Sequence, residues 1–80
     1  MSTRVRLFAA AAESVGHTEV HTGAGTVADL IEHLSSMGAP ETARVLQRCS
    51  LLINGRRSSS PQDAIPAGAV VDVLPPFAGG

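Results

Sequence analysis

The last six residues of the sequence carry the residue types with the clearest chemical use. They read Pro75-Pro76-Phe77-Ala78-Gly79-Gly80. The two prolines have fixed φ angles and no N–H to donate, so they end a β-strand and stiffen the exit from a sheet. The two glycines have no Cβ, so the last backbone atoms can enter a slot too narrow for any other residue. We therefore expect the carboxylate of Gly80 to be the reacting group of this chain.

A carboxylate reacts with a nucleophile only after one oxygen has become part of a leaving group, and adenylation achieves this. The bare Cα of Gly80 leaves the acyl carbon open to attack. Six residues beyond Leu74 extend at most about 20 Å, which is enough to enter an active site in another protein. The prolines reduce the freedom that is lost on insertion, and we expect Phe77 to fill a pocket of that partner.

The other residues that could do chemistry do not form a catalytic set. Cys49 is the only cysteine, so an internal disulfide is impossible and a reducing cytoplasm is indicated. A nucleophilic Cys49 would need a base and a pocket, and we expect a half-buried, small apolar side chain instead. No cluster of cysteines and carboxylates completes a metal site around His17, His21 or His33. The sequence therefore predicts no bound metal or cofactor and a protein that is not an enzyme by itself.

Length and composition restrict the class of protein. The sequence has 80 residues, so we expect one domain over residues 1–74 and a flexible tail over residues 75–80. A net charge of -1, with two Phe and no other aromatic residue, argues against nucleic-acid binding. The longest apolar run, Leu7–Ala12, is too short for a membrane span or a signal peptide. We expect a soluble, cytoplasmic protein with no membrane partner.

Hydrophobic periodicity predicts the elements that position the tail. The predicted strands are one around Val5, Leu7 and Ala9, then His17–Thr22, Leu51–Ile53, Arg56–Ser58 and Val70–Leu74. The predicted helices are Ala9–Val15 ending at Gly16, a main helix to Met37 with Thr26 as N-cap, and Glu41–Arg48. Asn54-Gly55 tolerates positive φ at both positions and predicts a two-residue hairpin turn.

The order of these elements predicts an α+β fold. The first and last strands are the most apolar and should lie centrally, and the second strand should pair with the first. The main helix should cover one face of the sheet through an apolar stripe of Val27, Leu30, Ile31, Leu34 and Met37. A mixed sheet packed on one main helix in this order is the arrangement of the β-grasp, or ubiquitin-like, fold.

Two parts of the sequence resemble the MoaD family, the small subunit of molybdopterin synthase. The first is Val5-Arg6-Leu7-Phe8-Ala9 with Glu13-Ser14-Val15-Gly16. The second is Leu52-Ile53-Asn54-Gly55, a turn at Ala67-Gly68, and the ending Val71–Gly80. The Pro-Pro-x-x-Gly-Gly ending is typical of the wider MoaD/ThiS sulfur-carrier superfamily. The length and the stretch to Gly16 favour MoaD over the shorter thiamin carrier ThiS.

This resemblance implies a β-grasp fold and a sulfur-carrier function. A MoeB-like adenylyltransferase would use ATP to adenylate Gly80, and a sulfur donor protein would replace AMP to leave a thiocarboxylate. A MoaE-like large subunit would then pass the sulfur to a pterin precursor of the molybdenum cofactor. Two alternatives stay open: a ThiS-like or other carrier for thiamin, cysteine or another thio-metabolite, and a ubiquitin-like interaction module whose tail is inert or conjugated to lysines.

The sequence also suggests where a partner docks. Phe8 and one of Leu51 or Leu52 would face outward from the sheet and form an apolar patch. The sequence does not say which leucine, because a register change of one residue exchanges the two faces of a strand.

Two pairs of arginines are candidates for a charged rim. Arg56 and Arg57 follow the predicted turn and are either a solvated hairpin or a rim for an acidic partner surface. Arg44 and Arg48 share one helical face, with the same two interpretations.

Overall fold

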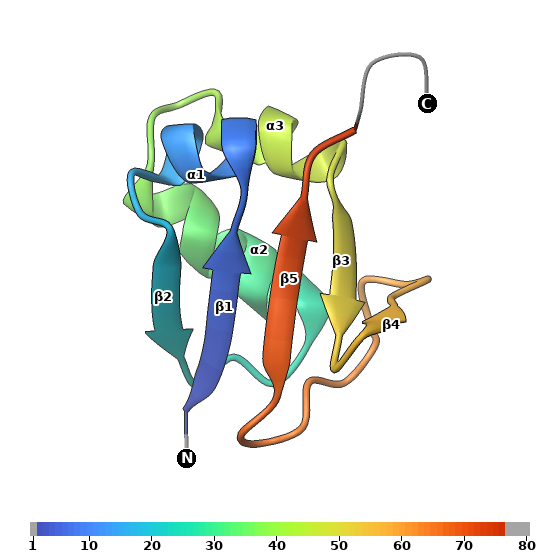
Figure 1. The fold of residues 1–80 in the computed structure, drawn as a ribbon. Helices are drawn as coiled ribbons and strands as arrows, with labels where there is room; N and C mark the ends of the chain where they lie inside the picture. The colour runs from blue at the N-terminus through green and yellow to red at the C-terminus, as the bar shows by residue number, and fades with distance from the viewer. Residues whose placement is uncertain (1, 77–80) are drawn as a thin grey trace.

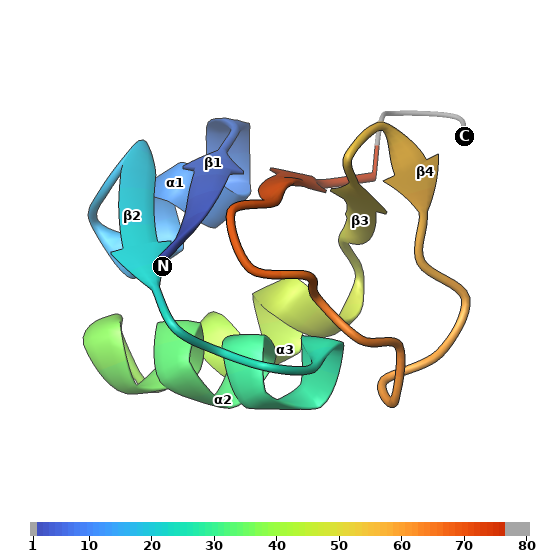
Figure 2. The same cartoon turned by 90° about the horizontal axis from the view of Figure 1, so that it is seen from below.

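The structure is a computed structural model that describes residues 2–76. Within this range five strands form one mixed sheet, and helices pack against it (Figure 1). The elements are β1 (Thr3–Leu7), α1 (Ala9–Val15), β2 (Glu19–Thr22), α2 (Val27–Met37), α3 (Thr42–Gln47), β3 (Ser50–Ile53), β4 (Arg56–Arg57) and β5 (Val70–Leu74). Seen from below, α2 and α3 lie on one side of the sheet (Figure 2). No helix of the described range is long and apolar enough to cross a membrane.

The first and last strands lie at the centre of the sheet, as the sequence predicts. The strand order is β2-β1-β5-β3-β4, and β1 runs parallel to β5 whereas the other neighbours are antiparallel. Val5 pairs with Val71 in the register of the parallel pair. Val5, Val71 and Val73 have no exposed surface. These two strands therefore supply much of the sheet's contribution to the core.

The main helix begins and packs as predicted. The Oγ1 atom of Thr26 accepts a hydrogen bond from the N–H of Asp29 at 3.2 Å, which caps the first turn of α2. Leu30 and Leu34 are completely buried against the sheet. Met37, at the end of the expected stripe, is 37% exposed. The apolar stripe of α2 is therefore buried in the middle of the helix and partly exposed to solvent in the last turn.

Two turns confirm the conformations that the sequence predicts. Gly16 ends α1 with a φ of 89°, and its N–H donates to the carbonyl of Ala12 at 2.8 Å. Asn54 and Gly55 have φ values of 52° and 83°, as a two-residue hairpin requires. The Oδ1 atom of Asn54 also accepts a hydrogen bond from the N–H of Val70 at 2.9 Å. The hairpin is thereby tied to the first residue of β5.

Four predicted elements are shorter than expected. β1 ends at Leu7 and does not include Ala9, which is the first residue of α1. β2 begins at Glu19 rather than His17, because its pairing with β1 reaches only as far as the Arg6–Glu19 pair. β4 ends at Arg57, since the hydroxyl of Ser58 donates to Asp63 at 2.8 Å and the chain turns there. α3 spans Thr42–Gln47, inside the predicted range 41–48.

Gly38 lies where the three helices meet. The buried hydroxyl of Thr42, the first residue of α3, donates to the carbonyl oxygen of Ser14 in α1 at 3.1 Å. A Cβ on Gly38 would overlap both that carbonyl oxygen and that hydroxyl. The φ of Gly38 is -107°, which any residue adopts. The glycine is therefore required by lack of space, and its role goes beyond the helix stop that the sequence indicates.

We predict that Gly38→Ala lowers the free energy of unfolding by about 1–3 kcal/mol, because the added methyl group must push the helices apart. Urea unfolding followed by circular dichroism measures the change. Gly23→Ala is the matched control, since a Cβ at Gly23 meets nothing within 4 Å. Equal free energies of unfolding for the two variants would contradict this, because they would show that a methyl group fits between the helices at Gly38.

Candidate functional site

The tail leaves the body from the central strand of the sheet. β5 is hydrogen-bonded to β1 on one side and to β3 on the other. Its last residue, Leu74, pairs with Ser50. Pro75 is buried and Pro76 is exposed. Figure 1 shows that β5 points toward the end of the sheet where α1 and α3 lie. The expected tail therefore starts from a root that is fixed on both sides.

Four residues of the expected tail, Phe77, Ala78, Gly79 and Gly80, lie outside the described residues. The partner pocket for Phe77, the narrow slot for Gly79 and the chemistry of Gly80 stay predictions. So does the division of the chain into a body of residues 1–74 and a tail of residues 75–80.

The sheet face opposite the helices carries apolar side chains close to the tail root. Phe8, directly after β1, is 41% exposed. Its neighbour Leu7 pairs with Val73, so Phe8 lies beside Leu74, which is partly exposed. Leu52 is also partly exposed and pairs with Asp72 on this face. We call Phe8, Leu52 and Leu74 the outer apolar patch.

Leu51 does not belong to this patch. It is only 6% exposed and pairs with the buried Val73, so its side chain is part of the core. The outward-facing leucine of this pair is therefore Leu52 and not Leu51, and a docking role for this face stays a prediction. The register of β3 against β5 decides which leucine faces outward, because neighbouring residues of a strand point to opposite faces.

Charged side chains beside the patch are largely paired. Arg6 donates to both carboxylate oxygens of Asp72, at 2.5 and 2.8 Å. Glu19 contacts Arg4 at 3.0 Å and His21 at 2.9 Å. The hydrogen bond from His21, followed by that from Arg4, lowers the pKa of Glu19. These contacts run across β2, β1 and β5 and leave little uncompensated charge on that part of the face.

The arginines of the predicted rim lie at the other edge of the sheet. Arg56 and Arg57 form the short strand β4, and both are exposed. Arg57 pairs with Leu52, so it borders the outer apolar patch. Among residues 2–76 neither arginine has a carboxylate at ion-pair distance, since the ion pairs of this range involve other residues.

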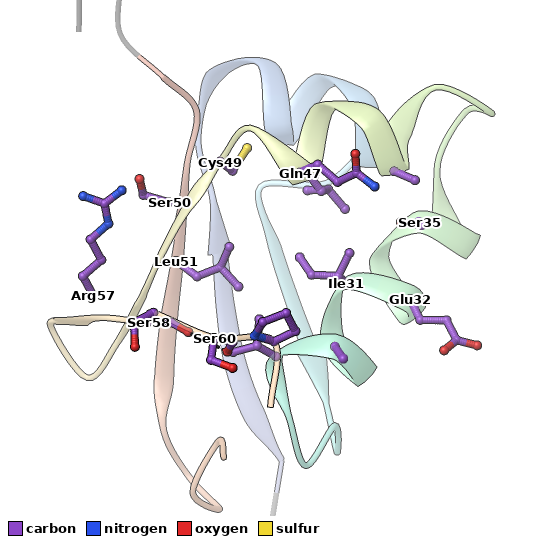
Figure 3. A pocket seen from close by; sticks show the side chains of 16 residues that line it. Ile31, Glu32, Ser35, Gln47, Cys49, Ser50, Leu51, Arg57, Ser58 and Ser60 are labelled. Atoms are coloured by element: carbon purple, nitrogen blue, oxygen red, sulfur yellow. Dashed lines mark hydrogen bonds between the residues drawn. The ribbon is translucent and has the colours of Figure 1, made fainter. Parts of the chain in front are cut away.

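A groove of about 700 Å³ opens on the helical side, between α2, α3, β3 and residues 57–61. Its apolar lining includes Val27, Ile31, Leu46 and Leu51. Figure 3 shows Ile31 and Leu51 pointing toward one another across it, from α2 and β3. The sequence analysis did not find this groove, because its walls come from four separate segments of the chain.

Cys49 lies half-buried at one end of the groove. Its Sγ atom donates to the carbonyl oxygen of Val45 at 3.3 Å, and burial raises the pKa of the thiol. A thiol with a raised pKa stays protonated at neutral pH and is a poor nucleophile. This environment agrees with the expected packing role of Cys49.

A comparison with protein families identifies the family of this chain. The profile of the ThiS family matches residues 5–80. The chain belongs to the ThiS family. None of the curated proteins matches it. Within the ThiS family this chain is a ubiquitin-like protein of the sulfur-carrier type, as the ending of the sequence predicts.

Several solved structures resemble this ThiS-family chain. SAMP1 from Haloferax volcanii is 27% identical, with a TM-score of 0.79 and 100% of both chains covered. The complex of subunits 1 and 2 of molybdopterin-converting factor from Helicobacter pylori contains a chain that is 21% identical, with a TM-score of 0.72 and 100% coverage of both. The BexX/CysO complex from Amycolatopsis orientalis contains one at 20% identity and a TM-score of 0.78, covering 98% of this chain and 99% of that one. These likenesses confirm the predicted β-grasp fold.

The segment that follows β4 forms one wall of the groove, and the carboxylate of Asp63 holds this segment in place. Asp63 Oδ2 accepts hydrogen bonds from the hydroxyl of Ser58 at 2.8 Å and from the N–H groups of Ser59 at 2.9 Å and Ser60 at 3.1 Å. The carbonyl oxygens of Pro61 and Asp63 then accept from the first N–H groups of α2. The sequence indicated only a loop here. An Asp three residues after a serine was the available signal, since such side chains bond to nearby backbone N–H groups.

We predict that Asp63→Asn lowers the melting temperature at neutral pH and that the gap to the unmodified protein closes in acid. The bond from Ser58, and then those from the two backbone N–H groups, lower the pKa of Asp63. Its contribution is therefore complete above the unfolded pKa of about 3.9 and is lost as the pH falls through the lower folded pKa. Melting curves from pH 7 to acid measure the gap. Glu19 titrates in both proteins, so the difference reports Asp63 alone, and a gap that is constant with pH would contradict this account.

Proposed function

We propose that this chain is a sulfur carrier whose reacting group is the Gly80 carboxylate. The observation that carries the proposal is the Pro-Pro-x-x-Gly-Gly ending placed directly after β5, the strand that is hydrogen-bonded on both sides, in a chain of the ThiS family. The body holds the root of the tail, and the tail brings its end to a partner. Catalytic side chains belong to those partners.

The proposed chemistry has two steps. In a MoeB-like adenylyltransferase, a carboxylate oxygen of Gly80 attacks the α-phosphorus of ATP and pyrophosphate leaves. Hydrosulfide supplied by a donor protein then attacks the acyl carbon, and AMP leaves with one of the original carboxylate oxygens. The product is a thiocarboxylate. No cofactor needs to stay bound to the carrier in either step.

The proposed destination of the sulfur is a pterin precursor in a MoaE-like large subunit. The likeness to subunit 1 in the Helicobacter pylori complex supports this choice. The likeness to the BexX/CysO complex supports a different acceptor, as in a ThiS-like carrier for another thio-metabolite.

A second candidate function is covalent protein modification. The chain is 27% identical to SAMP1 from Haloferax volcanii, and SAMP1 is the abbreviation of small archaeal modifier protein 1. In this case an amine of a target protein, rather than sulfur, would attack the activated Gly80.

The outer apolar patch is the proposed docking surface for the sulfur-accepting partner. Phe8 and Leu74 flank the tail root, so a partner that encloses the tail would cover them. Arg57 borders Leu52 and is available for a carboxylate at the rim of that partner.

We predict that incubation with a cognate adenylyltransferase, ATP and a sulfur donor replaces one terminal oxygen by sulfur. Intact-mass analysis detects the exchange, and fragmentation locates it at Gly80. Deletion of Gly80 should abolish it. Conversion that survives the deletion would exclude the terminal carboxylate as the reacting group. The loaded protein is then offered to a MoaE-like subunit with the pterin precursor, and sulfur transfer elsewhere without molybdopterin would exclude the MoaD-type assignment.

We predict that Phe8→Ala weakens binding to a MoaE-like subunit by about tenfold or more, because a partly exposed aromatic beside the tail root has the character of a hot spot. Isothermal titration calorimetry measures the dissociation constant. Met37→Ala is the matched control, since Met37 is similarly exposed at 37% but belongs to α2 on the other side of the sheet. Equal losses from the two variants would argue against the outer apolar patch as the docking surface.

A further inference from the structure

One end of the groove on the helical side adjoins the root of the tail. Leu74, the last residue of β5, pairs with Ser50, and Ser50 lines the groove. Figure 3 shows Cys49 and Ser50 at one end of the groove and Leu51 farther along it. We call the end lined by Ala43, Leu46, Gln47, Cys49 and Ser50 the near end. It is the part of the groove that lies beside the strand from which the tail leaves.

The burial pattern at the end of β5 predicts the side on which the next side chain falls. Val73 is buried in the core, and Leu74 is partly exposed on the opposite face. The alternation continues past the strand, because Pro75 is buried and Pro76 is exposed. Proline keeps φ in the extended range, and residues two apart in an extended chain share a face. Continued by one residue, the alternation predicts that Phe77 falls on the helical side, where the groove opens.

The groove offers an apolar surface with balanced charge. Ile31 and Cys49 line it and are only partly buried, so this apolar surface is open to solvent. The described residues contribute one cation, Arg57, and one anion, Glu32, to its lining. A lining with balanced charge favours an uncharged, apolar occupant. An aromatic ring has this character and would displace water from the groove.

We propose that the near end of the groove holds Phe77 of the same chain while the tail is outside a partner. Phe77 follows Leu74 by three residues, and three extended residues span about 10 Å. The near end begins at Ser50, the ladder partner of Leu74, and so lies within this reach. Attachment to the same chain gives Phe77 a high effective concentration at the groove, whereas a free segment loses its translational freedom on binding. Proximity and chemistry therefore select the same occupant.

The consequence of this docking for sulfur delivery rests on the proposed function. Phe77 is also expected to fill a pocket of the partner, so the groove and that pocket compete for one ring. A docked fraction of about one half to nine tenths lowers the apparent affinity for the partner by about 2- to 10-fold. The groove thereby acts as a resting place that a partner must outcompete before the tail is inserted.

Nuclear Overhauser spectra of the full chain test the docking directly. The chain carries ring-labelled phenylalanine and Phe8→Leu, which leaves Phe77 as the single labelled ring. We expect contacts from this ring to the methyl groups of Leu46 or Leu51, at every protein concentration. Phe77→Ala should shift those methyl signals, because the ring current is lost, and should leave the methyl signals of Val20 on β2 unchanged.

Two glutamine variants form a matched pair. Gln47→Glu places a carboxylate at an exposed position of the near end. It should weaken the contacts of Phe77, because the charge would lose water when the ring docks. Gln62→Glu makes the same change at an exposed position outside the groove lining and should preserve the contacts. Calorimetry should show that Gln47→Glu binds a MoaE-like subunit about 2- to 10-fold more tightly than Gln62→Glu.

Absence of contacts between Phe77 and the groove overturns the proposal. Contacts that grow with protein concentration also overturn it, because the occupant would then be the tail of a second copy. Equal contacts in Gln47→Glu and Gln62→Glu would exclude the near end as the site. Equal partner affinities, with the contacts of Gln47→Glu lost, would contradict the competition with the partner. Deletion of Gly80 should abolish sulfur loading and preserve the contacts of Phe77, so failure of the sulfur-carrier function is distinguishable from failure of the docking.

Discussion

The parallel pairing of β1 with β5 is the contact on which the rest of the structure depends. It joins the two halves of the sheet, because β2 attaches only to β1 and β3 attaches to β5. Its register buries Val71 and Val73 against the helices and at the same time places Asp72 and Leu74 on the opposite face. A single register therefore determines the core, the outer apolar patch and the direction in which the tail leaves. The packing of α2 depends on the same register, because the buried side chains of Leu30 and Leu34 need the apolar face of the sheet to pack against.

The net charge of -1 conceals an uneven distribution. On the outer face, Arg4 and Arg6 are neutralised by carboxylates from neighbouring strands. Such cross-strand pairs contribute little to stability when exposed, but they fix which part of the face stays apolar. The segment from Arg44 to Arg57 instead carries cations without carboxylate partners among the described residues. Arg57 pairs with Leu52, so part of this unpaired positive charge borders the outer apolar patch.

Much of the fold could be predicted from the sequence because local signals and packing agree. Thr26, Gly16 and Asn54-Gly55 have one dominant local conformation each, and the apolar stripe of α2 needs a sheet face to cover it. The choice between Leu51 and Leu52 could not be made, since it depends on the register between β3 and β5, which are far apart in sequence. The groove and the contacts of Gly38 also could not be predicted from the sequence, because they form where segments that are distant in the sequence meet. The chemistry assigned to Gly80 rests on the sequence alone.

The position of β5 has a consequence for how the protein is made. β5 lies in the middle of the sheet, yet it follows every other strand of the sheet in the chain. A nascent chain that has reached residue 69 has no strand to join β1 to β3, so the two halves of the sheet cannot pair. The body can complete its folding only when residues 70–74 have left the ribosome, and the tail follows directly behind them. Premature termination upstream of β5 therefore yields unfolded chains that proteases remove, rather than folded bodies that compete for partners without a reactive end.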